Sequence, residues 1–357
     1  MRRVLLLCAL LVGCTPQHTT APTPTGAPSE TRAPIDPCAP QPVPGDTNKA
    51  LARVDVLLRC GDDAGALEVR FALLRRDPAS TARAYALAAL AHETGRVAEI
   101  DPGVADLPLT GAARAVFRLT RDVLAYLDAI ARSAEGDGRG EAVLEGAALA
   151  RDVAATLALA ADDPYALAMA LRFTAVNDAD PTHRAAPICR DRADPLISRL
   201  RDDEGAAVLA SACAQIAYMS GEPVDGRRRF AAALERAPNH HPTALAWAAA
   251  EFAAGNFGEA VRLYALATAA PSPRLRYAAY LGLGVAHARQ HERRAAEAAY
   301  RQAAAVRGIE GADPDKLPPE LLFNLGTLLA DSPDPAGREE ARGLLRAYVA
   351  HPSADER

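Results

Sequence analysis

Histidines are the residues of this chain whose spacing could hold a metal ion. His287 and His291 stand four residues apart on an expected helix, with Glu292 next. Two histidines at that spacing face the same side of a helix and can ligate zinc. The acid does not complete the His-Glu-x-x-His pattern of zinc enzymes, so we predict that the chain has no metal site and no cofactor.

Two other histidine groups are weaker candidates for ligation. His92-Glu93 lacks a second histidine, and His240-His241 follows Pro238 in an expected turn, which favours a solvated pair. The chain contains no Gly-x-Ser-x-Gly motif, no phosphate-binding glycine loop and no Gly-x-Gly-x-x-Gly motif. Neighbouring acids stand where helices are expected to begin or end, and there they cap backbone amides: Asp62-Asp63, Asp162-Asp163 and Asp202-Asp203. These patterns predict that the protein is not an enzyme.

The amino terminus has the form of an export signal. Two arginines precede the apolar run Val4 to Val12, which is too short to span a bilayer. Leu11-Val12-Gly13-Cys14 resembles the lipid-attachment signal of bacterial lipoproteins. The resemblance implies that residues 1–13 are a signal peptide, and that Cys14 carries the lipid that anchors the protein to a membrane. The alternative is an ordinary export signal with a chance cysteine.

Residues 14–46 form a proline- and threonine-rich segment that we expect to be a disordered linker. Thr15 follows the lipidated cysteine, where an aspartate would resemble an inner-membrane retention signal. Its absence favours the outer membrane of the cell envelope, with the protein facing the periplasm.

The remaining cysteines predict disulfides. Of six cysteines in the chain, Cys8 leaves with the signal and Cys14 would carry lipid. The other four allow three pairings, and an even number in an exported chain indicates disulfide bonds. We favour the pairs of sequence neighbours: Cys38–Cys60 and Cys189–Cys213. The alternative is that Cys213 is simply a small buried residue of a helix.

Composition indicates an all-α protein. The chain is 50% hydrophobic with abundant alanine, the strongest helix former, and its net charge is -5. Basic and acidic residues alternate without a basic stripe, so nucleic-acid binding is not expected.

A repeat of about 34 residues runs through the carboxy-terminal half. Phe230 and Ala233 stand in the same register as Tyr264 and Ala267, and a further unit follows with Leu283-Gly284, Tyr300 and Ala303. This register resembles the tetratricopeptide (TPR) family. The resemblance implies a TPR-like α-solenoid of stacked antiparallel helix pairs, with the clear array over residues 207–352.

The chain before this array matches the repeat poorly. Residues 47–177 are expected to be a degenerate TPR-like helical region, which includes a helix pair over Thr47–Pro78, a break at Asp101-Pro102-Gly103 and a long helix over Gly111–Arg132. Residues 178–206 contain Pro181, Pro187 and Pro195 and are expected to be an irregular connection.

The TPR resemblance implies that the first helix of each pair lines a concave groove. Carried over to this chain, the groove residues are Gln215, Tyr218, Leu245, Phe252, Leu281, Arg289 and Phe323. This set is apolar and aromatic and suits an apolar peptide. The alternative is that these side chains pack against the chain's own helices.

The expected function is therefore a lipid-anchored extracytoplasmic scaffold. It would bind protein partners through the concave face, reach the membrane through its lipid, and assist the assembly of an envelope complex. Two alternatives stay open: a structural spacer subunit, and an enzyme or metal-binding protein built on a helical array.

Overall fold

The computed structural model describes residues 36–133, 139–177, 181–309, 314 and 316–351. Within these residues every regular element is a helix and there is no strand, which confirms the all-α prediction. The first elements are α2 (Thr47–Arg59), α3 (Asp63–Arg76), α4 (Thr81–Glu93), α5 (Val97–Ala105), α6 (Gly111–Ser133), α7 (Arg139–Leu159), α8 (Pro164–Asn177), α9 (Pro181–Ile188), the π-helix η1 (Cys189–Ala193) and α10 (Asp194–Arg199).

The remaining elements form regular antiparallel pairs. They are α11 (Asp203–Met219), α12 (Pro223–Arg236), α13 (His241–Ala253), α14 (Phe257–Ala267), α15 (Pro273–Arg289), α16 (Arg293–Val306), α17 (Pro319–Ala330) and α18 (Pro335–Ala350). No helix among the described residues is long and apolar enough to cross a membrane.

Short polar turns start and stop these helices. Asp46, Asp62 and Ser80 each accept a hydrogen bond from a backbone amide in the first turn of the helix that follows. Several turns inside helix pairs contain a glycine with positive φ, as at Gly255, because the left-handed conformation costs glycine little. The turn between α15 and α16 has His291 in this conformation instead. These signals are local, and they explain why the helix boundaries follow the sequence closely.

Small residues bring the two helices of a pair close together. At Gly284 of α15, an added Cβ atom would lie 2.4 Å from the ring of Tyr300 in α16. No larger side chain fits there while Tyr300 remains buried. The repeat register of the sequence is thus a packing requirement between neighbouring helices.

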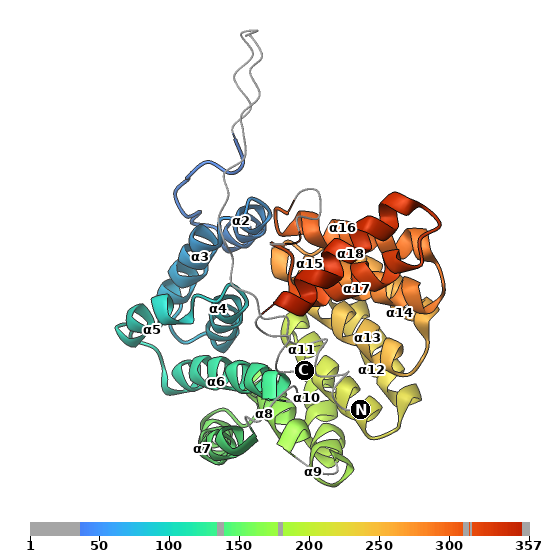
Figure 1. Cartoon of the computed structure of the whole chain (residues 1–357). Coiled ribbons are helices and arrows are strands. Elements are labelled where there is room, and N and C mark those ends of the chain that lie inside the picture. The colour runs from blue at the N-terminus through green and yellow to red at the C-terminus, as the bar shows by residue number, and fades with distance from the viewer. Residues whose placement is uncertain (1–35, 134–138, 178–180, 310–313, 315, 352–357) are drawn as a thin grey trace.

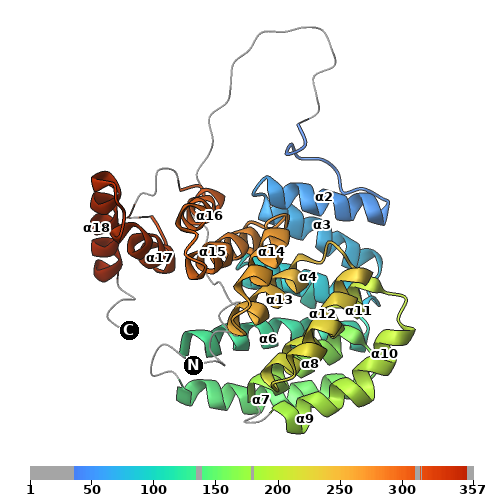
Figure 2. The same ribbon diagram turned by 90° about the vertical axis from the view of Figure 1, so that its right-hand side faces the viewer.

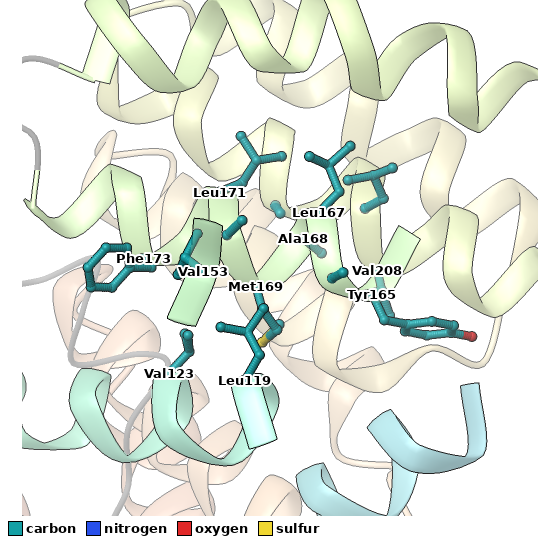
Figure 3. Packing of buried hydrophobic residues seen from close by; sticks show 14 of the residues in the cluster. Leu119, Val123, Val153, Tyr165, Leu167, Ala168, Met169, Leu171, Phe173 and Val208 are labelled. Carbon is teal, nitrogen blue, oxygen red and sulfur yellow. The ribbon is translucent and has the colours of Figure 1, made fainter. Parts of the chain in front are cut away.

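Successive apolar clusters connect the chain from end to end. One cluster joins α2 to α6, the next joins α6 to α11, a third joins α11 to α15, and a fourth joins α15 to α18. Figure 3 shows the second cluster, in which Leu119 and Val123 of α6 face Met169 of α8. Because consecutive clusters share a helix, each pair is buried against its neighbours.

The helices follow a curved path that brings distant parts of the chain together. Figures 1 and 2 both show α2 close to α15. Arg59 at the end of α2 donates a hydrogen bond of 3.4 Å to the backbone oxygen of Ala269, which follows α14. Arg274 of α15 donates one of 3.1 Å to the backbone oxygen of His92 in α4. The array is thereby closed into a ring.

Two expectations about proline were wrong. Residues 178–206 were expected to be irregular, but α9, η1 and α10 occupy 181–199. Pro187 lies inside α9 and is followed at once by the wider π-helix, while Pro195 lies in the first turn of α10, where a missing N–H costs nothing. The break expected at Asp101-Pro102-Gly103 is instead the interior of the short helix α5.

Other expectations are confirmed. The helix pair over Thr47–Pro78 is α2 with α3, and the long helix over Gly111–Arg132 is α6. Both disulfide pairings are present, with Cα–Cα distances of 5.8 Å for Cys38–Cys60 and 5.6 Å for Cys189–Cys213. Residues 36–46 contain no helix. The signal peptide, Cys14 and most of the 14–46 linker lie outside the described residues.

The two disulfides should differ in their effect on stability and in their access to reductant. Cys189 and Cys213 are buried and join the π-helix to α11, whereas Cys38 is exposed. Replacing Cys189 and Cys213 together with serine should lower the free energy of unfolding by about 3 kcal/mol in a urea titration. In the unmodified protein without denaturant, a thiol reductant should open Cys38–Cys60 first, as alkylation and mass spectrometry would show. Equal reduction rates would contradict this assignment of burial.

Candidate functional site

Glu251 of α13 is a buried carboxylate that the fold satisfies completely. Its side chain has no exposed surface. It accepts hydrogen bonds from five donors on three helices and a turn: Tyr218 Oη at 2.6 Å, Arg227 Nε at 2.6 Å and Nη2 at 2.9 Å, Trp247 Nε1 at 3.1 Å and Asn256 Nδ2 at 2.7 Å. Burial opposes its charge, but these bonds outweigh burial and lower its pKa to about 2. Glu251 therefore joins two successive helix pairs.

An open hollow of about 700 Å³ lies beside this network. Trp247, Phe257, Asn256 and Gln290 contribute to its wall. The charged residues that line the hollow are already paired, Arg227 with Glu251 and Glu259 with Arg262. The network therefore joins the α11–α12 and α13–α14 helix pairs and leaves neither oxygen of Glu251 unused for a ligand.

A second polar group lies where the first helices meet the amino-terminal ends of later ones. We call it the inner polar cluster. It consists of Asp55 and Arg59 of α2, Arg70 of α3, Tyr85 and Glu93 of α4, Arg172 of α8, Glu204 of α11, His240 and His241 at the start of α13, and Arg274 of α15. Figure 1 shows α2, α4, α11 and α15 around the middle of the molecule.

Mutual electrostatic effects show that these groups face one another. Burial raises the pKa of Glu204, Arg70 opposes the rise, and Asp55 adds to it. Burial also raises the pKa of Asp55, against Arg70, Arg59 and His241. Helices α2, α3, α11 and α13 are therefore within electrostatic reach of each other. Both carboxylates remain open to solvent although protein surrounds them closely enough to raise their pKa values, which places them in a recess.

The pKa of Glu93 shifts in the opposite direction to that of Glu251. Burial raises its pKa to about 7, Arg274 and Arg70 lower it, and Asp63 raises it. Its Oε1 is buried and accepts no hydrogen bond from the described residues. Glu93 therefore exchanges a proton near neutral pH, and its oxygen is an acceptor without a donor.

Other buried polar atoms of the cluster also have no partner among the described residues. They are Arg70 Nε, Arg172 Nε and His241 Nδ1. Buried polar groups in folded proteins are almost always hydrogen-bonded, so a concentration of such atoms needs an explanation. The cluster presents unused donors and an unused acceptor together, and this arrangement can bind a polar ligand.

The histidines differ from the expected solvated pair. Burial lowers the pKa of His240 to about 4, with Arg172 and His241 adding to the effect, so His240 is neutral. Its Nδ1 lies 2.7 Å from Thr243 Oγ1. His287 Nδ1 lies 2.6 Å from Glu292 Oε2. Among the described residues, no group of three or more His, Cys, Asp or Glu side chains could hold a metal ion.

The predicted groove residues do not form one open surface. Gln215 and Leu245 are buried, with 7% of each exposed. Arg289 is exposed and Phe323 is 45% exposed, far along the array. Three others are partly buried: Tyr218, Phe252 and Leu281.

Several of these residues already have partners within the chain. Tyr218 donates its hydroxyl to Glu251 and its ring lies against Gly226. The ring of Phe252 packs on Phe257 with centroids 5.3 Å apart. Gln215 Nε2, in contrast, is buried without a hydrogen-bond partner among the described residues.

Sequence reasoning missed the inner polar cluster. Its members are single charged or aromatic residues on seven helices, from Asp55 to Arg274, with no motif and no common spacing. Only the closure of the array brings them together. The one usable signal was the pair His240-His241, which we interpreted as solvated.

Comparisons with known proteins add no family. No protein-family model matches this chain, and a search of curated proteins finds no relative.

The proton of Glu93 predicts an unusual pH dependence of stability. Its carboxyl has a pKa of about 7 in the folded protein and an ordinary value of 4.5, so it binds a proton more tightly when folded. Stability should therefore fall as pH rises from about 4.5 to about 7, by at most about 3 kcal/mol. Glu93→Gln should remove that part of the slope in urea titrations at several pH values. Glu68→Gln, at an exposed position of α3, is the control, and equal slopes in both variants would contradict the assignment.

Proposed function

We propose that this protein is a lipid-anchored extracytoplasmic scaffold of the TPR type, which binds a protein partner on the inner face of its helical array. Two features of the fold support the proposal. The described chain is an array of antiparallel helix pairs, and such arrays bind partners on extended curved surfaces. The inner polar cluster supplies unused hydrogen-bonding atoms on that surface.

The unpartnered atoms are the observation that carries this proposal. Buried donors and acceptors without protein partners cost free energy when nothing binds them, so four of them within one cluster support a binding role over that of a spacer. In contrast, the buried Glu251 shows that this fold can satisfy a carboxylate completely where the structure requires it. The partner segment is accordingly a polar one that offers both an acceptor for arginine and a donor for Glu93.

The proposed binding surface differs from the apolar groove expected from the TPR resemblance. Phe323 and Arg289 remain available for a partner at the carboxy-terminal end, but Gln215 and Leu245 are covered. We therefore place the main contact at the inner polar cluster, and Phe323 at most at its periphery.

The location of the protein forms the second part of the proposal. Export and attachment of lipid to Cys14 would leave the helical array on a proline-rich linker at the envelope, with the outer membrane favoured over the inner. Two disulfides, Cys38–Cys60 and Cys189–Cys213, are compatible with an oxidising compartment.

Loss of Arg70 and Arg172, whose Nε atoms have no hydrogen-bond partner among the described residues, should reduce partner binding. Arg70→Ala with Arg172→Ala should lower the amount of partner cross-linked in intact cells by about tenfold or more, since hydrogen bonds to charged groups are worth about 1.5 to 3 kcal/mol each. Arg346→Ala, at an exposed position of α18, is the matched control, and quantitative mass spectrometry of the purified complexes is the measurement. Unchanged partner levels would favour the spacer function. Phe323→Ala in parallel tests the apolar groove.

Replacement of Cys14 tests the anchor separately. Cys14→Ser should move the protein from the membrane fraction to the soluble extracytoplasmic fraction, because a protein without acyl chains has no such anchor. Immunoblots of fractionated cells provide the measurement. If the variant stays with the membrane, lipidation of Cys14 is not what holds the protein there.

A further inference from the structure

Arg274 closes the array by reaching from the first turn of α15 to the far end of α4. Its Nη1 donates to the backbone oxygens of His92 at 3.1 Å and Glu93 at 3.3 Å. These carbonyls end α4, and the last carbonyls of a helix have no partner inside the helix. A cation at the carboxy-terminal end of a helix also complements its dipole. The contact is therefore favourable both as a set of hydrogen bonds and as an interaction with the helix dipole.

Asp128 of α6 completes this contact. Its Oδ2 lies 3.0 Å from His92 Nε2 and 3.8 Å from Arg274 Nη2. The three side chains are mostly buried, with exposed fractions of 13% for His92, 13% for Asp128 and 21% for Arg274. One carboxylate thus links α4, α6 and α15.

This contact joins parts of the array that are not neighbours. In stacked helix pairs each pair normally touches only the next one. Arg274 instead reaches residues about 180 positions earlier in the chain. The apolar cluster of α2 to α6 shares no residue with those of α11 to α18, so the closure depends on polar contacts rather than on a common core.

Separation at this point breaks a different kind of contact from separation of neighbouring pairs. Parting two neighbouring pairs exposes a shared apolar cluster, whereas parting α4 from α15 breaks the hydrogen bonds of Arg274, its contact with Asp128 and the long contact between Arg59 and Ala269. Glu93 lies at this polar contact. The Glu93 carbonyl accepts from Arg274, while its carboxylate belongs to the inner polar cluster.

We propose that the contact of Arg274 with α4 and Asp128 is a latch, and that its opening admits a partner segment to the inner polar cluster. The inference rests on the proposed function, because it concerns access to the same site. In the closed ring Asp55 and Glu204 are open to solvent, whereas Arg70, Arg172 and Glu93 are partly buried. With the latch open, α4 and α15 part, and Arg70, Arg172 and Glu93 face solvent.

The matched variants are Arg274→Ala and Arg276→Ala, in the full-length protein. Arg276 lies two residues further along α15, but it donates to Ala270 O and Pro271 O within its own connection. Its loss removes an arginine from the same helix and breaks no hydrogen bond between α15 and α2 or α4. It also relieves the like charge that Arg276 places near Arg59, which does not favour opening. Asp128→Asn serves as a second, milder test of the latch, because it removes the carboxylate and keeps the volume.

Two measurements report on opening. Hydrogen exchange followed by mass spectrometry should show exchange about tenfold faster at the end of α4 and the first turn of α15 in Arg274→Ala, with α11 and α12 unchanged. Labelling with phenylglyoxal, a small arginine reagent, should modify Arg70 and Arg172 faster by a similar factor. Asp128→Asn should change both in the same direction by a smaller factor, and Arg276→Ala should change neither.

The outcomes separate the latch from the proposed function. Unchanged exchange and labelling in Arg274→Ala and Asp128→Asn would overturn the latch, whatever the partner does. Faster exchange at α4 without faster labelling of Arg70 and Arg172 would also overturn it, because the contact would then not control access. If hydrogen exchange in α11 also rises in Arg274→Ala, that variant has lost stability in general. The latch is then judged from the exchange and labelling of Asp128→Asn alone. The proposed function fails by a different result, unchanged partner levels when Arg70 and Arg172 are replaced.

Discussion

The burial of alanine-rich helix faces between successive pairs is the constraint on which this structure depends. Alanine and glycine allow close approach, so large side chains such as Tyr300 fill the space between two helices instead of separating them. No pair buries its apolar face alone, and each apolar cluster shares a helix with the next. Because neighbouring pairs use their apolar surface on each other, polar side chains remain for the inner face and for the contacts that close the ring.

Two glutamates show that the fold contains both fully hydrogen-bonded carboxylates and carboxylates with an unused oxygen. Glu251 and Glu93 are both shielded from water, yet their pKa values move in opposite directions, to about 2 and about 7. The difference lies in the partners, since Glu251 has donors on each oxygen and Glu93 Oε1 has none among the described residues. Glu251 stabilises the junction of two helix pairs. Glu93 lacks such a set of donors among the described residues, and the proposed function therefore assigns it a role in binding.

The sequence predicted the parts of the fold that local chemistry determines. Helix boundaries at Asp62 and Gly255 follow from capping and turn conformation, and both disulfides were predicted from the four cysteines that remain in a chain expected to be exported. Pro187 was misjudged because a π-helix accommodates it, which no local rule predicted. The inner polar cluster could not be predicted, because it exists only once Arg274 reaches His92 across the ring. The TPR resemblance stays a prediction, supported by the pairing of the helices.

The central claim is that polar contacts at Arg274 close the array and keep the buried atoms of Arg70, Arg172 and Glu93 covered. The most direct measurement is the distance between spin labels placed by genetic encoding at Ala98 of α5 and Ala265 of α14, both exposed and on opposite sides of the closure. The account predicts one narrow distance distribution in the unmodified chain and a broader, longer one when Arg274 is replaced by alanine. A broad distribution in the unmodified chain, or the same narrow one in both proteins, would contradict it.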